Sequence, residues 1–207
     1  MSIVSIVLVC DGTSDICIQD IIQWVVDENF SDRTFRIQAA REVIPAHVSL
    51  DARIRRAEEI YEPDIIVCHR DTENNTLIQR LAEINEATAI ANIATRVVPA
   101  IPIRMVESWL LIDSSAIRSA ANNKNGTQPL LLPTHPRIEN SADPKSILFA
   151  ALNTASGLPP QRLRRFDVHK ARSRITGYID SFAPLRHQAG FIRFERDLVA
   201  AVQTIAE

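Results

Sequence analysis

The chain has 207 residues and a formal net charge of −2. Hydrophobic residues make up 46% of it and charged residues 23%, a composition typical of globular proteins that excludes a disordered, collagen-like or strongly basic chain. The sequence holds only 5 glycines against 11 prolines, so it has few residues suited to the many turns of an all-β sandwich. This length fits one domain, or one domain with a small elaboration.

The first half of the chain alternates apolar strands with helices. Residues Ile3–Cys10 are almost entirely apolar and rich in β-branched residues, which is typical of a strand buried on both faces. In chain order, we expect strands at 3–10, 34–39, 65–68 and 97–103, with helices at 16–30, 51–61 and 75–91. The helix at 51–61 is basic and is expected to face solvent. Pro99 and Pro102 favour an edge position for the last strand. This order predicts an α/β fold with a mainly parallel central sheet of about four strands flanked by helices.

The second half of the chain is predicted to be helical. We expect helices at 106–121, 144–154, 167–182 and 191–206, and a loop rich in Asn and Pro at 122–143. The pattern therefore predicts an α/β core over residues 1–121, followed over 122–207 by a loop insertion and C-terminal helices that pack on the same domain.

The N-terminal apolar run is predicted to be a strand and not a targeting segment. It has no basic stretch before it and no small-residue cleavage site after it, and it is shorter than the about 20 residues that a membrane span needs. The cysteines (Cys10, Cys17 and Cys68) are odd in number, which favours free thiols in a reducing compartment. We therefore expect a cytoplasmic protein with no membrane partner.

Acidic residues follow three of the predicted strands. Asp11 ends the first strand, His69 and Asp71 lie at the end of the third, and Glu107 follows the fourth. Ligand sites of open α/β sheets lie beyond the carboxyl ends of the strands, so these groups are expected to converge if the strands are neighbours. Clustered carboxylates repel one another unless a cation neutralises them. The pattern predicts a divalent-metal site formed by Asp11, Asp71 and Glu107, with His69 as a further ligand or a base for water.

Each of these residues also has a purely structural interpretation. Asp11 and Asp71 are placed where they could cap the helices that follow, and Glu107 could lie in the first turn of a helix, where the helix dipole favours it. His69 could be a buried structural histidine. The sequence contains no Gly-rich phosphate loop, no Gly-x-Ser-x-Gly and no His-Glu-x-x-His, so other common catalytic sites are not indicated.

Charge is distributed unevenly along the chain. Residues 1–160 carry 14 Lys or Arg and 20 Asp or Glu, whereas residues 161–207 carry 9 and 5, so the last segment has a net charge of +4. Most of its basic residues are Arg162, Arg164, Arg165, Lys170, Arg172 and Arg174. On a helical surface this group could bind the phosphates of a nucleic acid, or it could form an ordinary solvated face.

Several segments resemble Toprim-like proteins. The sequence Asp11-Gly-Thr-Ser-Asp15 after the first strand resembles their strand–Glu-Gly-x-Thr-Glu start, and His69-Arg-Asp71 falls where they carry Asp-x-Asp. Three further segments together resemble a family of small bacterial Toprim-like proteins over nearly the whole chain: Ile101–Asp113, Asp143-Pro-Lys and the helix that begins Phe191-Ile-Arg-Phe.

The resemblance implies a function. Toprim domains occur in topoisomerases, primases and nucleases of the overcoming-lysogenisation-defect type, where the first Glu is a general acid or base and the Asp pair holds Mg²⁺ for phosphoryl transfer. The resemblance implies that this chain is a metal-dependent nuclease that acts on nucleic acid, beside an ATPase subunit in phage defence. Asp11 would then stand in place of the Glu, and Asp71 would be a metal ligand. His69 replaces the other Asp, and an imidazole suits Mn²⁺ better than Mg²⁺. The alternative is an inactive Toprim-like partner subunit that binds an ATPase or nucleic acid.

Overall fold

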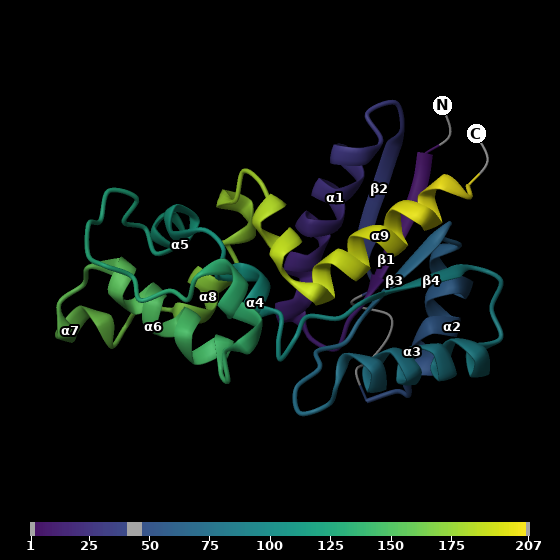
Figure 1. Cartoon of the computed structure of the whole chain (residues 1–207), viewed down its shortest axis with the longest axis horizontal. Helices are drawn as coiled ribbons and strands as arrows, with labels where there is room; N and C mark the ends of the chain where they lie inside the picture. The colour runs from purple at the N-terminus through teal and green to yellow at the C-terminus, as the bar shows by residue number, and fades with distance from the viewer. Residues whose placement is uncertain (1–2, 41–46, 206–207) are drawn as a thin grey trace. The chain divides into compact units, whose positions relative to one another are not determined.

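The structure is a computed structural model that describes residues 3–40 and 47–205 (Figure 1). The chain forms two compact units, of which unit 1 comprises Met1–Pro102 with Ala189–Glu207 and unit 2 comprises Ile103–Gln188. The sequence predicted an α/β core over residues 1–121 with residues 122–207 packed on the same domain. The C-terminal helix α9, Ala189–Gln203, belongs to unit 1 because it packs on the last strand of the sheet.

Unit 1 is built on a four-stranded, all-parallel sheet. The strands are β1 (Ile3–Val9), β2 (Thr34–Ala39), β3 (Ile65–His69) and β4 (Arg96–Ala100), in the order β2-β1-β3-β4. The predicted α/β class is therefore confirmed, and β4 with its Pro99 is an edge strand as expected. Because Val9 pairs with Cys68, the residues that follow β1 and β3 leave the sheet side by side.

Helices cover both faces of this sheet. They are α1 (Ile18–Asn29), which follows a 3₁₀ turn at Thr13–Cys17, α2 (Leu50–Tyr61), α3 (Leu77–Ala91) and α9. On one face, α2 and α3 pack on alternate strand residues such as Val7 and Ile66. On the other face lie α1 and α9, joined by the rings of Trp24 and Phe191 at 6.4 Å (Figure 1). Central strand residues are fully buried because both faces are covered.

Unit 2 consists of short helices and turns. The helices are α4 (Glu107–Leu110), α5 (Ser114–Ala120), α6 (Pro144–Ser156), α7 (Pro160–Leu163) and α8 (Val168–Arg172), with 3₁₀ turns at His135–Asn140, Thr176–Tyr178 and Ala183–His187. The helix predicted at 144–154 is present, but the one predicted at 106–121 is broken because the Asp113 carboxylate accepts hydrogen bonds from the backbone N–H groups of Ser115 and Ala116 and starts a new helix.

All three cysteines are free thiols. A search of residues 3–40 and 47–205 found no helix that is both long enough and apolar enough to cross a membrane.

Candidate functional site

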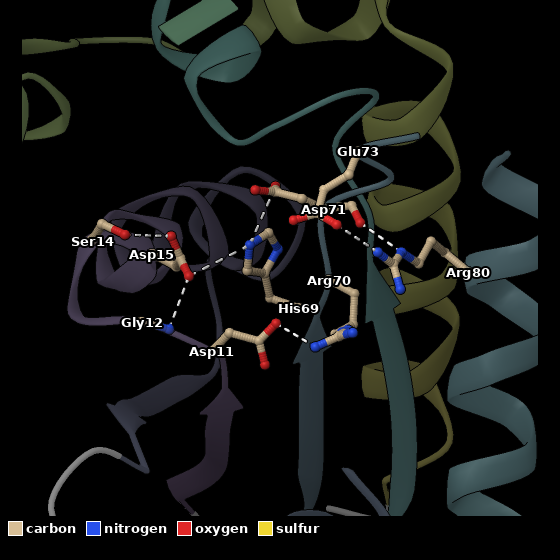
Figure 2. A pocket seen from close by; sticks show the side chains of 9 residues that line it. All are labelled: Asp11, Gly12, Ser14, Asp15, His69, Arg70, Asp71, Glu73 and Arg80. Carbon is tan, nitrogen blue, oxygen red and sulfur yellow. Dashed lines mark hydrogen bonds and ion pairs between the residues drawn. The ribbon is translucent and has the colours of Figure 1, made fainter. Parts of the chain in front are cut away.

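A pocket of about 330 Å³ opens at the carboxyl ends of β1 and β3 (Figure 2). Its lining residues come from the loop after β1, from the end of β3 with its following loop, and from α3: Asp11, Gly12, Ser14, Asp15, His69, Arg70, Asp71, Glu73 and Arg80. Adjacent parallel strands bring these loops together. The pocket therefore contains three of the residues singled out from the sequence, namely Asp11, His69 and Asp71.

His69 is fixed at the back of this pocket. Its side chain is 2% exposed, and Nδ1 lies 3.0 Å from the carbonyl oxygen of Ala100 on β4. A carbonyl only accepts, so Nδ1 carries a proton, and Nε2 is the ring nitrogen that faces the pocket. Burial lowers the pKa of His69, although the negative charge of Asp15 acts against it.

Two carboxylates face the free edge of this ring. The His69 Nε2 lies 3.5 Å from Oδ1 of Asp71 and 3.9 Å from Oδ2 of Asp15, and Figure 2 shows the ring between them. Asp15 is held in place because it accepts hydrogen bonds from the Gly12 N–H at 3.1 Å and from the Ser14 hydroxyl at 2.8 Å. A lone pair facing two carboxylates is repulsive unless a proton or a metal cation lies between them.

Asp11 has different partners. Its Oδ1 lies 2.6 Å from Nη1 of Arg53, and its Oδ2 pairs with Arg70. Arg53 belongs to α2, a helix that the sequence predicted to face solvent, but this residue is 3% exposed and also donates to the carbonyl of Cys10. The Asp11 carboxylate thus bridges two guanidinium groups, which is a structural role.

An ion-pair network continues from Arg70 across the pocket. Glu83 bridges Arg70 and Arg80, with N–O distances of 2.9 Å and 2.5 Å, and Glu73 pairs with Arg80 at 3.1 Å. The Arg80 Nε also donates to the backbone carbonyl of Asp71 at 2.7 Å, which fixes the loop that carries this aspartate. Sequence reasoning did not assign Arg70, Arg80 or Asp15 to the site. Arg70 meets Asp11, 59 residues away, only on folding. Asp15 is the last residue of the Asp11–Asp15 motif and is held by its own loop.

Glu107 and Arg172 belong to unit 2, where they pair with each other. The Arg172 Nε lies 3.1 Å from Glu107 Oε1, and the two residues are 3% and 5% exposed. Glu107, predicted to bind a metal, and Arg172, predicted to bind nucleic acid, are therefore both neutralised in the interior of this unit. The other basic residues of the predicted nucleic-acid surface are exposed or half-buried: Arg162, Arg164, Arg165, Lys170 and Arg174.

The pocket brings together one imidazole and two carboxylates, which are donor types that divalent cations use, but they are not arranged around a common point. Within the described residues, no group of three or more His, Cys, Asp or Glu side chains is arranged to hold a metal ion. Neighbouring ligands on a six-coordinate cation lie about 3 Å apart, which follows from bond lengths of about 2.1 Å. The distances from Nε2 to the carboxylate oxygens of Asp71 and Asp15, 3.5 Å and 3.9 Å, exceed this by less than 1 Å.

Comparisons with models of known protein families, with curated proteins and with solved structures found no match. The resemblance to Toprim-like proteins therefore stays a prediction from the motifs.

Proposed function

We propose that this chain is a divalent-metal-dependent phosphodiesterase, a nuclease that acts on nucleic acid in the cytoplasm. The observation that carries the proposal is the buried His69 ring with Asp15 and Asp71 at its Nε2 edge. The resemblance to Toprim nucleases supports the same chemistry.

The proposed ligands differ in part from the set that the sequence predicted. Asp15, His69 and Asp71 would hold the cation, whereas Asp11 and Glu107 are already neutralised by arginines. One nitrogen and two carboxylate donors favour Mn²⁺ over Mg²⁺. A bound ion would act as a Lewis acid that stabilises the charge developing on the phosphoryl oxygens.

Arg70 is the proposed phosphate-binding residue of this pocket. Its side chain is about one quarter exposed, and it lies on the pocket wall between Asp11 and Glu83. A guanidinium group offers parallel N–H donors that match two phosphate oxygens. Asp11 is then a positioning residue, because it holds Arg70 toward the pocket while Arg53 neutralises its other oxygen.

Cleavage of fluorescent oligonucleotides with Mn²⁺ or Mg²⁺ tests this proposal. Asp71→Asn keeps the side-chain shape but removes a ligand charge, so we expect cleavage to fall by about 100-fold or more. Glu86→Gln, at an exposed position of α3, is the matched control and should cleave like the parent. Mn²⁺ binding, measured from the EPR signal of the free ion, should weaken in Asp71→Asn alone. No cleavage with either metal, or equal cleavage by both variants, would contradict the proposal.

The second candidate is a catalytically inactive partner subunit that binds an ATPase or nucleic acid, with a role in phage defence. The ion-pair network favours it, because Arg53, Arg70 and Arg80 already have carboxylate partners. The two candidates differ in metal binding. An inactive subunit is expected to leave the Mn²⁺ signal unchanged and to raise the ATP hydrolysis of its partner subunit equally with and without Asp71→Asn.

A further inference from the structure

A second pocket lies wholly within unit 2. Its volume is about 160 Å³, and it is lined by Ala120, Asn122, Phe166, Asp167, Lys170, Ala171 and Arg174. Taking about 30 Å³ for each water molecule of the liquid, it has room for about five waters, which is the size of a phosphate group with part of its sugar and not of a whole nucleotide.

The charges around this pocket favour an anion. Lys170 and Arg174 contribute two cations, and neither has a carboxylate partner among the residues that the structure describes. The single acid, Asp167, caps α8 by accepting a hydrogen bond from the Lys170 N–H at 2.9 Å, so its carboxylate is directed to its own helix. The side-chain oxygen of Asn122 lies 3.5 Å from Nη1 of Arg174 and helps to orient that guanidinium.

The surroundings extend the positive charge. Arg164 and Arg165 are exposed and directly precede Phe166, and Arg162 lies one turn earlier in the chain. None of these three forms an ion pair with a described carboxylate. Arg172, by contrast, is neutralised by Glu107, so unit 2 separates one buried structural arginine from a group of exposed cations.

An aromatic ring lies beside these cations. Phe166 is half-buried and lines the same pocket as Lys170 and Arg174, so the pocket has an aromatic side chain as well as two cations. Proteins that bind single-stranded nucleic acids combine these two elements, because cations hold the backbone while unpaired bases stack on aromatic rings. A duplex keeps its bases stacked inside and would use only the cations.

We propose that this pocket binds one backbone phosphate of a single-stranded nucleic acid, held by Lys170 and Arg174, with the adjoining base or sugar against Phe166. The inference rests on the proposed function for its biological purpose, since it names the strand state of the substrate. Its test measures binding without cleavage, so the single-strand inference and the proposed nuclease function can fail separately.

Fluorescence anisotropy with labelled single-stranded DNA, single-stranded RNA and duplex DNA, with EDTA to prevent cleavage, tests the inference. We expect at least one single strand to bind more tightly than the duplex. In Lys170→Ala/Arg174→Ala, the plot of log affinity against log salt should become less steep by about 0.7, the value for one phosphate contact on a single strand. Arg137→Ala/Lys145→Ala removes the same charge from exposed sites of unit 2 outside the pocket and should not change this slope.

The aromatic contact has a separate test. Phe166→Leu keeps an apolar side chain, so the fold is maintained while stacking is lost, and single-strand affinity should fall by about fivefold. Phe166→Trp should restore it, and duplex affinity should be the same in all three proteins. Equal effects of the two double variants, tighter binding of duplex, or no effect of Phe166→Leu would overturn the inference. If the binding results are as expected but no nucleic acid is cleaved, only the proposed nuclease activity is overturned.

Discussion

At the scale of single residues, Asp11 shows how folding can change the meaning of a motif. Its place at the end of the first strand favoured a metal ligand, and the resemblance to Toprim proteins implied an acid–base role. In the structure its carboxylate lies between Arg53 and Arg70. Arg53 is 42 residues away in the sequence, so no local pattern indicates that it neutralises this aspartate.

The stability of variants measures this role of Asp11. Asp11→Asn leaves the buried Arg53 guanidinium without its counter-charge, and we expect the free energy of unfolding to fall by about 2 kcal/mol. This loss of stability is smaller than the loss expected for a fully buried ion pair, because Asp11 itself is partly exposed. Urea unfolding gives the value, and Glu59→Gln, at an exposed position of the same helix as Arg53, is the control. Equal midpoints for the two variants would contradict a structural role.

At the scale of elements, local sequence signals predicted most of unit 1 and part of unit 2. The β-branched runs and helical spacings located every strand and helix of unit 1, because such patterns depend on neighbours in the chain. The helix predicted at 167–182 contains only α8 and a 3₁₀ turn at Thr176–Tyr178. Gly177 lies in that turn, and a glycine weakens a continuous helix there.

The first turn of α6 gives a pH-dependent prediction. The Asp143 carboxylate caps this helix by accepting hydrogen bonds from the Ser146 hydroxyl at 2.6 Å and the Ser146 N–H at 2.9 Å, and these bonds lower the pKa of Asp143 below its ordinary value of 3.8. A lowered pKa in the folded state means that the stabilisation is complete above about pH 5 and is lost as the pH falls through 3.8 and below.

Asp143→Asn isolates this contribution, since asparagine also caps helices but does not titrate. The stability difference between parent and variant should be present at pH 7 and shrink steadily between pH 5 and pH 3, as measured by urea unfolding across that range. Asp113→Asn, at the N-cap of α5, serves as the comparison. A difference that stays constant with pH would show that the charge of Asp143 does not stabilise α6.

At the scale of the whole molecule, the sheet and its two helical layers bury the central strands from both sides. Cys68 in β3 is fully buried, and this burial raises the pKa of its thiol to about 12. Cys10, at the end of β1, is only half-buried. The reactivity of a thiol follows the fraction that is ionised and accessible, so the three-layer packing predicts a clear difference between these two cysteines.

Iodoacetamide labelling followed by mass spectrometry measures that difference. Under native conditions at pH 8, Cys10 should be modified first, and Cys68 should react only through global unfolding of the sheet. Urea near the unfolding midpoint should accelerate the labelling of Cys68 far more than that of Cys10. Native labelling of Cys68 at the rate of Cys10 would mean that the helical layers open without global unfolding.

The sequence by itself determined the class of fold, the location of the strands and the edge of the sheet where Asp11, His69 and Asp71 meet, because strand periodicity and the direction of parallel strands are encoded locally. Only the tertiary structure decided which charges neutralise one another. Glu107 and Arg172 are 65 residues apart, and their pairing removes one from the predicted metal ligands and the other from the exposed cations. Electrostatic partners depend on distance in space, and folding brings together residues that no spacing in the chain relates. The net charge of −2 therefore bears on solubility and association. The ion pairs that form on folding decide which charged groups remain to bind a metal or a phosphate.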